Sequence, residues 1–236
     1  MDSLYIIIPA YNEENNIEKC VDDWYSVVEN HNDDGESRLV VINDGSKDKT
    51  YDLLCSMSEE RPLLVPLTKE NGGHGSTVLF GYRYAIENGA DYIFQTDSDG
   101  QTNPEEFEEF WQNREKYDAL IGERLERGDG NGRKFVESVA CILLKLIFGV
   151  SAKDANAPFR LMKSSLVDKY INRLPADFNI PNIMFTTYFL YYNESMKFIP
   201  ISFEQRVAGK TSINVKKIMR IGVKAVGAFR RFKKDM

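Results

Sequence analysis

Several features that mark large classes of proteins are absent from this chain of 236 residues. Its three cysteines, Cys20, Cys55 and Cys141, are odd in number and lack metal-binding spacing, so we expect free thiols in a reducing compartment. No stretch reaches the roughly 18 uncharged apolar residues of a membrane-spanning helix. The beginning, Met-Asp-Ser-Leu, lacks the basic region of a signal peptide. These absences together predict a cytoplasmic protein.

Two nucleotide-binding signatures are also missing. A dinucleotide-binding loop built on Gly73 and Gly75 would need a third glycine at position 78, where the chain has Val78. The phosphate-binding pattern Gly-x-x-x-x-Gly-Lys-Ser/Thr does not occur, which excludes a P-loop protein. We see no repeat, low-complexity tract or linker within the body. We therefore expect one domain over residues 1–212 and a tail over residues 213–236.

Charge is distributed unevenly along the chain. Residues 207–236 contain nine Lys or Arg and one acidic residue, a local charge of +8, whereas the whole chain carries −6. An acidic body with a basic tail is not the pattern of a nucleic-acid-binding protein, which needs a basic face on the domain itself.

The tail itself has a helical pattern. Ile218, Ile221, Ala225, Phe229 and Phe232 recur at helical spacing, largely opposite the basic side chains. This predicts a basic amphipathic helix that docks peripherally on the anionic inner face of the cytoplasmic membrane. Alternatively, the helix packs its apolar stripe on the body or on another subunit of a homo-oligomer.

Apolar, β-rich segments alternate with helical patterns along the chain. Strands are predicted at residues 4–9, 38–42, 63–67, 92–96, 118–122 and 198–203. We also expect helices at 104–116 and 135–148, and a loop at 151–162. Strands and helices joined by short loops predict an α/β fold with a mostly parallel sheet flanked by helices. Ligands of such sheets bind beyond the carboxyl ends of the strands, which is where the loops with unusual chemistry lie.

The strand at 92–96 is followed by two carboxylates one residue apart. In an extended segment Asp97 and Asp99 point the same way, so they can converge on one ligand. With a third oxygen from Gln101 they form a donor set that suits Mg²⁺ or Mn²⁺. The alternative is a polar turn after a strand, since Asp, Ser and Gly are common turn residues.

Polar residues at other strand ends suit a nucleotide. Asp44 could accept hydrogen bonds from a ribose or base, or begin an Asx-turn. Three arginines, Arg124, Arg133 and Arg206, lie in loops or at element ends, and guanidinium groups suit phosphate oxygens. Any one of them alone would be read as a surface cation. We interpret His74 as a loop residue.

Four motifs in this order and spacing resemble family-two glycosyltransferases with the GT-A fold. They are Ile8-Pro9-Ala10-Tyr11-Asn12-Glu13-Glu14, Asn43-Asp44-Gly45-Ser46-Lys47-Asp48-Lys49-Thr50, Asp97-Ser98-Asp99-Gly100-Gln101 and the segment Asp154 to Arg160. The resemblance covers about residues 3–212, and four motifs in register are far more specific than one. Within the family the chain most resembles the polyprenyl-phosphate (dolichol-phosphate) mannosyltransferase-like branch.

The resemblance implies an inverting, metal-dependent transferase of cell-envelope glycan synthesis. It would move a sugar from a nucleoside-diphosphate sugar, UDP- or GDP-linked, to a polyprenyl-phosphate or glycan acceptor, with Mg²⁺ or Mn²⁺. Carried over residue by residue, the nucleotide pocket falls on Pro9, Tyr11, Glu13, Asp44 and Asp97. The metal ligands fall on Asp97, Asp99 and Gln101, the acceptor-side carboxylate on Asp154, and phosphate contacts on Arg124, Arg133 and Arg206.

Departures from the family pattern concern the acceptor. Ser98 stands where the metal motif usually has Ala, and Pro158 stands before Phe159 where Gly is common. Asp154 would act as a general base for a sugar hydroxyl, or would orient a phosphate acceptor that is already anionic. A sugar-nucleotidyltransferase is the alternative enzyme, but the Gly-rich basic signature expected near its N-terminus is missing. The remaining alternative is a non-catalytic, membrane-docked partner of a transferase.

Overall fold

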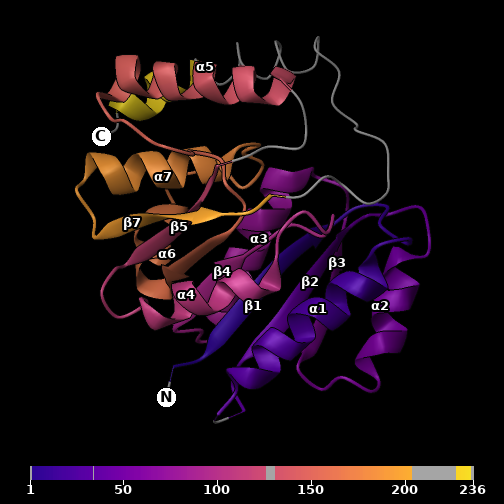
Figure 1. Cartoon of the computed structure of the whole chain (residues 1–236). Helices are drawn as coiled ribbons and strands as arrows, with labels where there is room; N and C mark the ends of the chain where they lie inside the picture. Colours follow the sequence, from indigo (N-terminus) through magenta and orange to yellow (C-terminus); the bar gives the residue numbers. More distant parts are fainter. Residues whose placement is uncertain (1, 34, 126–130, 204–226, 235–236) are drawn as a thin grey trace.

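The computed structural model describes residues 2–33, 35–125, 131–203 and 227–234. A seven-stranded sheet with the order β3-β2-β1-β4-β6-β5-β7 forms its centre (Figure 1). The strands are β1 (Leu4–Ala10), β2 (Arg38–Asp44), β3 (Leu64–Lys69), β4 (Tyr92–Gln95), β5 (Ala119–Arg124), β6 (Arg160–Lys163) and β7 (Met196–Ile201). All neighbouring strands pair in parallel except that β6 is antiparallel to both β4 and β5. The predicted α/β fold with a mostly parallel sheet is confirmed.

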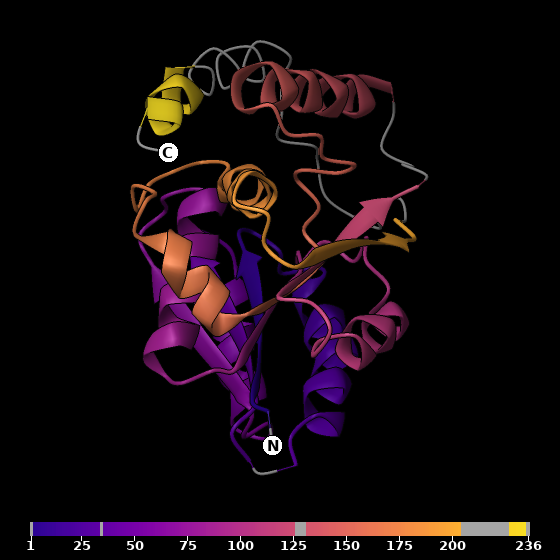
Figure 2. The same ribbon diagram turned by 90° about the vertical axis from the view of Figure 1, so that its left-hand side faces the viewer.

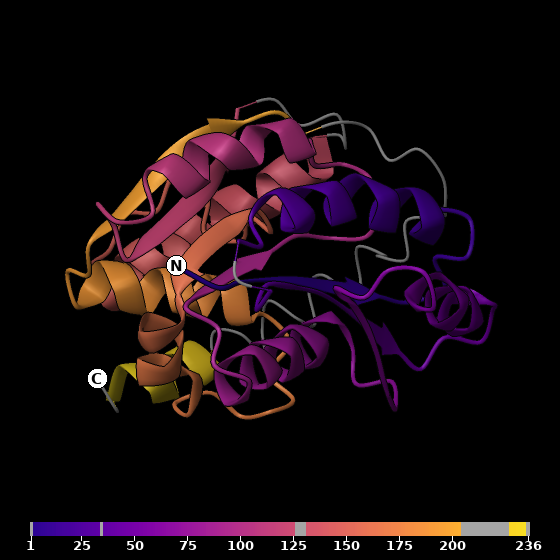
Figure 3. The same cartoon turned by 90° about the horizontal axis from the view of Figure 1, so that it is seen from below.

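Helices cover both faces of this sheet. They are α1 (Ile17–Asn30), α2 (Thr50–Ser58), α3 (His74–Glu87), the 3₁₀ turn η1 (Pro104–Glu106), α4 (Phe107–Gln112), α5 (Asn131–Phe148), α6 (Ser164–Ile171) and α7 (Pro181–Tyr191). The view from below shows α1 and α4 on one side of the sheet and α3 and α6 on the other (Figure 3). Two apolar cores result, one on each face.

Alternation of side chains along the strands creates the two cores. On β1, Ile6 and Ile8 pack with α1 and α4, whereas Tyr5 and Ile7 pack with α3. Successive side chains of a strand point to opposite faces, so a strand buried on both sides is apolar throughout. This explains why β1 and β2 read as uninterrupted apolar runs in the sequence.

The second half of the chain differs from prediction in one element. The segment 151–162 was expected to be a loop, but its last three residues belong to β6, which begins at Arg160. A charged residue at the start of a four-residue strand conceals the pattern of an otherwise apolar segment. Boundaries also shift: the helical segment expected at 104–116 ends at Gln112, the apolar helix begins at Asn131 rather than at residue 135, and the last strand covers Met196–Ile201 rather than 198–203.

Part of the predicted tail lies outside the described residues, namely 213–226 together with 235–236. Residues 227–234 are helical and lie beside α5 at the end of the molecule opposite the N-terminus (Figure 2). Phe229 is buried against Phe148, with ring centroids 5.9 Å apart, and Phe232 packs edge-on against Phe178 at 5.3 Å. In this part of the tail the apolar side chains therefore pack on the body, which is the alternative that the sequence left open. No described helix is both long and apolar enough to cross a membrane.

Candidate active site

The loops with unusual chemistry gather at one edge of the sheet. Strands β1 to β5 all run in the same direction, so the loops after Ala10, Asp44, Lys69 and Gln95 meet at their carboxyl ends. β6 runs the other way, and Arg160 at its beginning pairs with both Gln95 and Ile121. The loop that carries Asp154 therefore ends at the same edge.

Asp44 organises the loop that follows β3. Its Oδ1 accepts hydrogen bonds from Lys69 Nζ at 2.6 Å and from the backbone N–H of Gly72 at 2.9 Å, and its Oδ2 accepts one from the backbone N–H of Gly73 at 2.9 Å. Burial alone would raise the pKa of Asp44, but the hydrogen bonds from Lys69 and Gly72 outweigh it and hold the pKa below its usual value. Asp44 is thus an ionised, buried anchor of a glycine-rich loop.

The loop after β1 is tied to the loop after β2. Asn12, in a left-handed conformation with φ of 54°, accepts a hydrogen bond from the backbone N–H of Lys47 at 2.8 Å. The backbone N–H of Glu13 donates to Thr50 Oγ1 at 2.9 Å, and the Glu13 side chain is buried. Tyr11, which directly precedes Asn12, is exposed at the edge, whereas Pro9 is a buried residue of β1. Of the predicted nucleotide residues in this segment, Tyr11 is the one that presents its ring to solvent.

The paired carboxylates lie in a turn directly after β4. Thr96 and Thr102 close this turn with a hydroxyl contact of 2.8 Å, and Asp99 Oδ1 accepts a hydrogen bond from the backbone N–H of Gln101 at 3.3 Å. Asp97 is partly exposed, and the Gln101 side chain is buried. Their roles as metal ligands stay predictions, since no group of three or more His, Cys, Asp or Glu side chains within the described residues is arranged to hold a metal. The hard carboxylate oxygens of Asp97 and Asp99 nevertheless fit a Mg²⁺ or Mn²⁺ ion chemically.

His74 is a residue of this edge that the sequence interpretation set aside. It begins α3, and its Nε2 lies 2.9 Å from Asp97 Oδ1. The His74 side chain is half exposed, and its partial desolvation would lower the pKa of the ring, but the charge of Asp97, its hydrogen bond and the charge of Asp99 together raise it. The signal available in the sequence was its position, since His74 begins a helix directly after two glycines at a strand end.

Asp154 and Arg124 form a buried ion pair on the other side of β4. Arg124 Nε donates to Asp154 Oδ2 at 2.7 Å, and Arg124 Nη2 donates to Oδ1 at 2.8 Å. The two side chains are 8% and 3% exposed. Both oxygens of the carboxylate are engaged, so Asp154 is held in one orientation by a bidentate partner. The sequence interpretation placed both residues at this edge but not against one another.

Arg160 holds the loop that carries Asp154 by hydrogen bonds to its backbone. Its guanidinium group is fully buried and donates to the carbonyl oxygen of Ala157 through Nε at 3.0 Å and Nη2 at 2.7 Å, and to that of Asn182 at 3.2 Å. Burial lowers the pKa of Arg160, and the charge of Asp154 acts in the opposite direction. The guanidinium thereby joins the Asp154 loop, β6 and the beginning of α7.

The side chains of two predicted arginines, Arg133 and Arg206, are outside the described part of the structure. Arg133 belongs to the first turn of α5, at an element end as expected, but its side chain lies outside the described residues. Arg206 lies outside them altogether. Their predicted phosphate contacts stay predictions.

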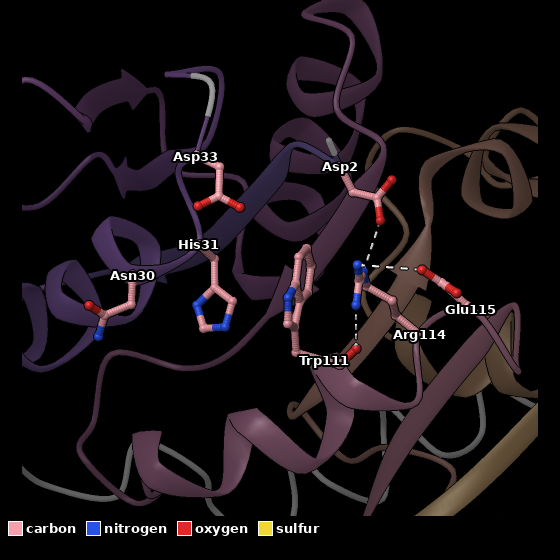
Figure 4. A pocket seen from close by; sticks show the side chains of 7 residues that line it. All are labelled: Asp2, Asn30, His31, Asp33, Trp111, Arg114 and Glu115. Atoms are coloured by element: carbon pink, nitrogen blue, oxygen red, sulfur yellow. Dashed lines mark hydrogen bonds and ion pairs between the residues drawn. The ribbon is translucent and has the colours of Figure 1, made fainter.

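A polar pocket of about 330 Å³ lies at the opposite edge of the sheet (Figure 4). Its lining includes Asp2, which precedes β1, and His31, which follows α1. Arg114 stacks 4.3 Å from the Trp111 ring centroid, and His31 lies edge-on to the same ring at 5.1 Å. Trp111 is thus enclosed between two neighbours, and this pocket is separate from the carboxyl edge that collects the predicted site.

A mostly parallel sheet with a glycine-rich loop anchored on Asp44 and paired carboxylates after its central strand defines a GT-A-like α/β protein. The chain belongs to glycosyl transferase family 2, whose model matches residues 5–171. The predicted resemblance is thereby confirmed at the level of the family.

The sequences of curated relatives align with part of this chain. The UDP-N-acetylglucosamine--dolichyl-phosphate N-acetylglucosaminyltransferase of Methanococcus voltae is 30% identical over 52% of this chain and 52% of its own length. The undecaprenyl-phosphate mannosyltransferase of Micrococcus luteus is 26% identical over 67% of this chain and 65% of its own length. The matches thus cover only about half to two thirds of these two relatives.

Solved structures share the fold across nearly the whole chain. Glucosyl-3-phosphoglycerate synthase from Mycobacterium tuberculosis, in complex with Mn²⁺, UDP-glucose and phosphoglyceric acid, superposes with a TM-score of 0.69 at 16% identity, covering 98% of this chain and 79% of that one. TarS from S. aureus in complex with UDP-GlcNAc gives a TM-score of 0.64 at 15% identity, covering 98% and 69%. At these identities the likeness establishes the fold.

Proposed function

We propose that this protein is an inverting glycosyltransferase that moves a sugar from a UDP-sugar to a polyprenyl-phosphate acceptor. The observation that carries the proposal is the meeting of three groups at one sheet edge: the Asp44 loop, the Asp97–Asp99 turn and the Arg124–Asp154 pair. Family membership supports the class of reaction. The names of the relatives support the acceptor, since both act on a lipid phosphate.

On the donor side, the base and ribose of UDP would lie between Tyr11 and the Asp44 loop. The uridine nucleotides bound to both structural neighbours support UDP over GDP. The backbone N–H groups at the beginning of α3 would face the diphosphate, since a helix N-terminus favours negative charge. Asp97 and Asp99 would hold the divalent ion, which supplies charge neutralisation of the leaving diphosphate when bound.

On the acceptor side, a phosphate oxygen of the lipid would attack the anomeric carbon. The new carbon–oxygen bond would form as the bond from that carbon to the diphosphate breaks, and UDP would leave on the opposite face. A phosphate is already anionic, so no proton has to be removed from it. The role of Asp154 is then to orient Arg124 towards the acceptor phosphate, which agrees with a carboxylate whose two oxygens are both engaged.

Lipid phosphate as acceptor implies action at a membrane. We propose a peripheral protein at the cytoplasmic face, with the catalytic body over residues 1–212 and a basic tail after it. That boundary falls among residues outside the described ones.

Transfer assays with purified protein test this function. The donors are UDP-glucose, UDP-N-acetylglucosamine and GDP-mannose, each with Mn²⁺; the acceptors are a polyprenyl phosphate in detergent and a soluble glycan. We expect a lipid-linked sugar from a UDP-sugar and none from the Asp99→Asn variant. Transfer to the glycan alone would overturn the acceptor, and transfer from GDP-mannose alone would overturn the donor. Absence of both transfer and donor hydrolysis would favour the non-catalytic alternative.

A further inference from the structure

In its described part, residues 139–148, helix α5 is apolar on two opposite faces, and one of them is exposed. Leu144 and Phe148 are buried against the body. On the other side Val139, Ile142 and Leu146 are 38%, 57% and 76% exposed. Residues three, four and seven apart share one face of a helix, so these three form a continuous ridge, here called the α5 stripe. A helix that is apolar all round is normally enclosed on all sides, so an open stripe marks a surface that meets a partner.

Among the described side chains of α5 and of the helix at 227–234, the charged ones are all cations. Lys145 is exposed beside Leu146, and residues 139–150 contain no acidic residue. The helix at 227–234 contacts α5 through Phe229 and Phe148, and it exposes Arg230, Arg231 and Lys234 without any acidic residue. This basic surrounding contrasts with the net charge of −6 for the chain. The partner must therefore offer both an apolar interior and negative charge.

A second copy of this chain fits these demands poorly. Other exposed large apolar residues in the described part of the chain lie singly on separate elements: Tyr11, Phe80 and Leu125. A copy could match the stripe only with its own stripe, and that contact would bring the two sets of cations together. An anionic bilayer satisfies both demands, because acyl chains lie directly beneath charged headgroups.

We propose that the α5 stripe inserts into an anionic membrane while Lys145, Arg230, Arg231 and Lys234 contact its headgroups. The tail then contributes its charged side chains to membrane binding. Phe229 and Phe232 do not insert, because they pack on the body. Figure 1 shows α5 along the outer end of the molecule, and five residues separate Phe148 from Asp154. This inference deepens the proposed function and rests on it for the acceptor: a lipid phosphate at the α5 surface lies one short loop from Asp154.

A fluorescent probe on the stripe tests insertion directly. In the Leu146→Trp variant, emission should shift to shorter wavelength on addition of phosphatidylcholine vesicles that contain phosphatidylglycerol, and lipids brominated in their acyl chains should quench it. Vesicles of phosphatidylcholine alone should have a much weaker effect, and added salt should weaken binding. The wild type, with Trp24 and Trp111 only, gives the background. An emission wavelength that does not change on addition of vesicles overturns the proposal. So does an emission that is already at short wavelength without lipid, since the chain would then cover its own stripe.

A pair of variants measures the contribution of the stripe. Ile142→Ser with Leu146→Ser should lower vesicle partitioning by about tenfold or more, because both substitutions remove apolar area from the inserted face. Phe80→Ser, which removes an exposed apolar residue of α3, should leave partitioning unchanged. Melting temperature and UDP affinity report that both variants are folded. Unchanged partitioning of the double variant overturns the proposal. If the same substitutions convert a dimer to a monomer, the stripe is a contact between copies of the chain, which also overturns it.

The two proposals fail in different ways. Vesicle binding is measured without donor or acceptor, so it does not depend on transfer. Binding through the stripe without transfer to polyprenyl phosphate would overturn the proposed function and leave the membrane surface intact. Transfer to a detergent-dispersed acceptor without vesicle binding would overturn the proposed membrane surface and leave the proposed function intact.

Discussion

Arg124 clamps Asp154 through two parallel hydrogen bonds of 2.7 and 2.8 Å in a nearly dry part of the site. Breaking a buried ion pair from one side leaves the other charge uncompensated, which costs far more than the pair contributes when intact. The two residues therefore have to be considered together, as a structural clamp and as part of the proposed acceptor side.

Asp154→Asn should lower turnover strongly and leave UDP affinity near the wild-type value. The free energy of unfolding should fall by up to about 3–5 kcal/mol, because the Arg124 guanidinium loses its counter-charge. Isothermal titration with UDP, transfer rates and denaturant unfolding measure the three quantities. A collapse of donor affinity in a folded variant would place Asp154 on the donor side instead.

Asp99→Asn should abolish the dependence of UDP binding on Mn²⁺ while the fold survives. The carboxylate is a hard ligand for the ion, whereas its amide replacement carries no charge. Titration of UDP with and without Mn²⁺ measures the effect, and Asp168→Asn on the exposed side of α6 is the control. UDP affinity that stays metal-dependent in Asp99→Asn would contradict the assignment.

Acid should loosen the Asp44 loop. The pKa of Asp44 is lower in the folded protein than its usual value of about 3.8, so its contribution to stability is complete above that value and is lost as pH falls below it through the lowered pKa. We expect the free energy of unfolding to fall less steeply below about pH 4 in Asp44→Asn than in the wild type. The exposed neighbour substitution Glu70→Gln should keep the wild-type slope. Equal slopes in all three proteins would show that Asp44 has no special role.

Gly75→Ala should destabilise the beginning of α3. A Cβ there would lie 2.3 Å from the carbonyl oxygen of Phe178 and 2.5 Å from the carbonyl carbon of Asn179, so backbone has to move. Overpacking of this kind costs about 1–3 kcal/mol. Gly227→Ala, where nothing lies within 4 Å, is the matched control in thermal unfolding. An unchanged melting temperature in Gly75→Ala would mean that the Phe178 segment yields without cost.

Local signals in the sequence were enough to predict six of the seven strands and the sheet edge at which the predicted site residues lie. Apolar runs such as Leu4–Ala10 mark buried strands, and the polar residues after them mark the carboxyl edge. Contacts between distant segments had no such signal. His74 and Asp97 are 23 residues apart, and Lys69 reaches Asp44 across 25. β6 was missed because the buried Arg160 guanidinium is stabilised by hydrogen bonds to the carbonyl groups of Ala157 and Asn182, which no local pattern reveals.

The antiparallel strand β6 also determines the order in which the molecule can assemble. β4 and β5 have no bond to one another and are joined only through β6, while the other neighbour of β5 is β7. A nascent chain that has emerged as far as Gly149 already contains β1 to β4, which are consecutive neighbours in the order β3-β2-β1-β4, and β4 lacks only its pairing with β6. β5 has no partner at that moment, since both of its neighbours are still to be synthesised. The half of the sheet that carries Asp44 and Asp97 can thus fold during synthesis, and Arg124 meets Asp154 only after β6 closes the gap between the halves.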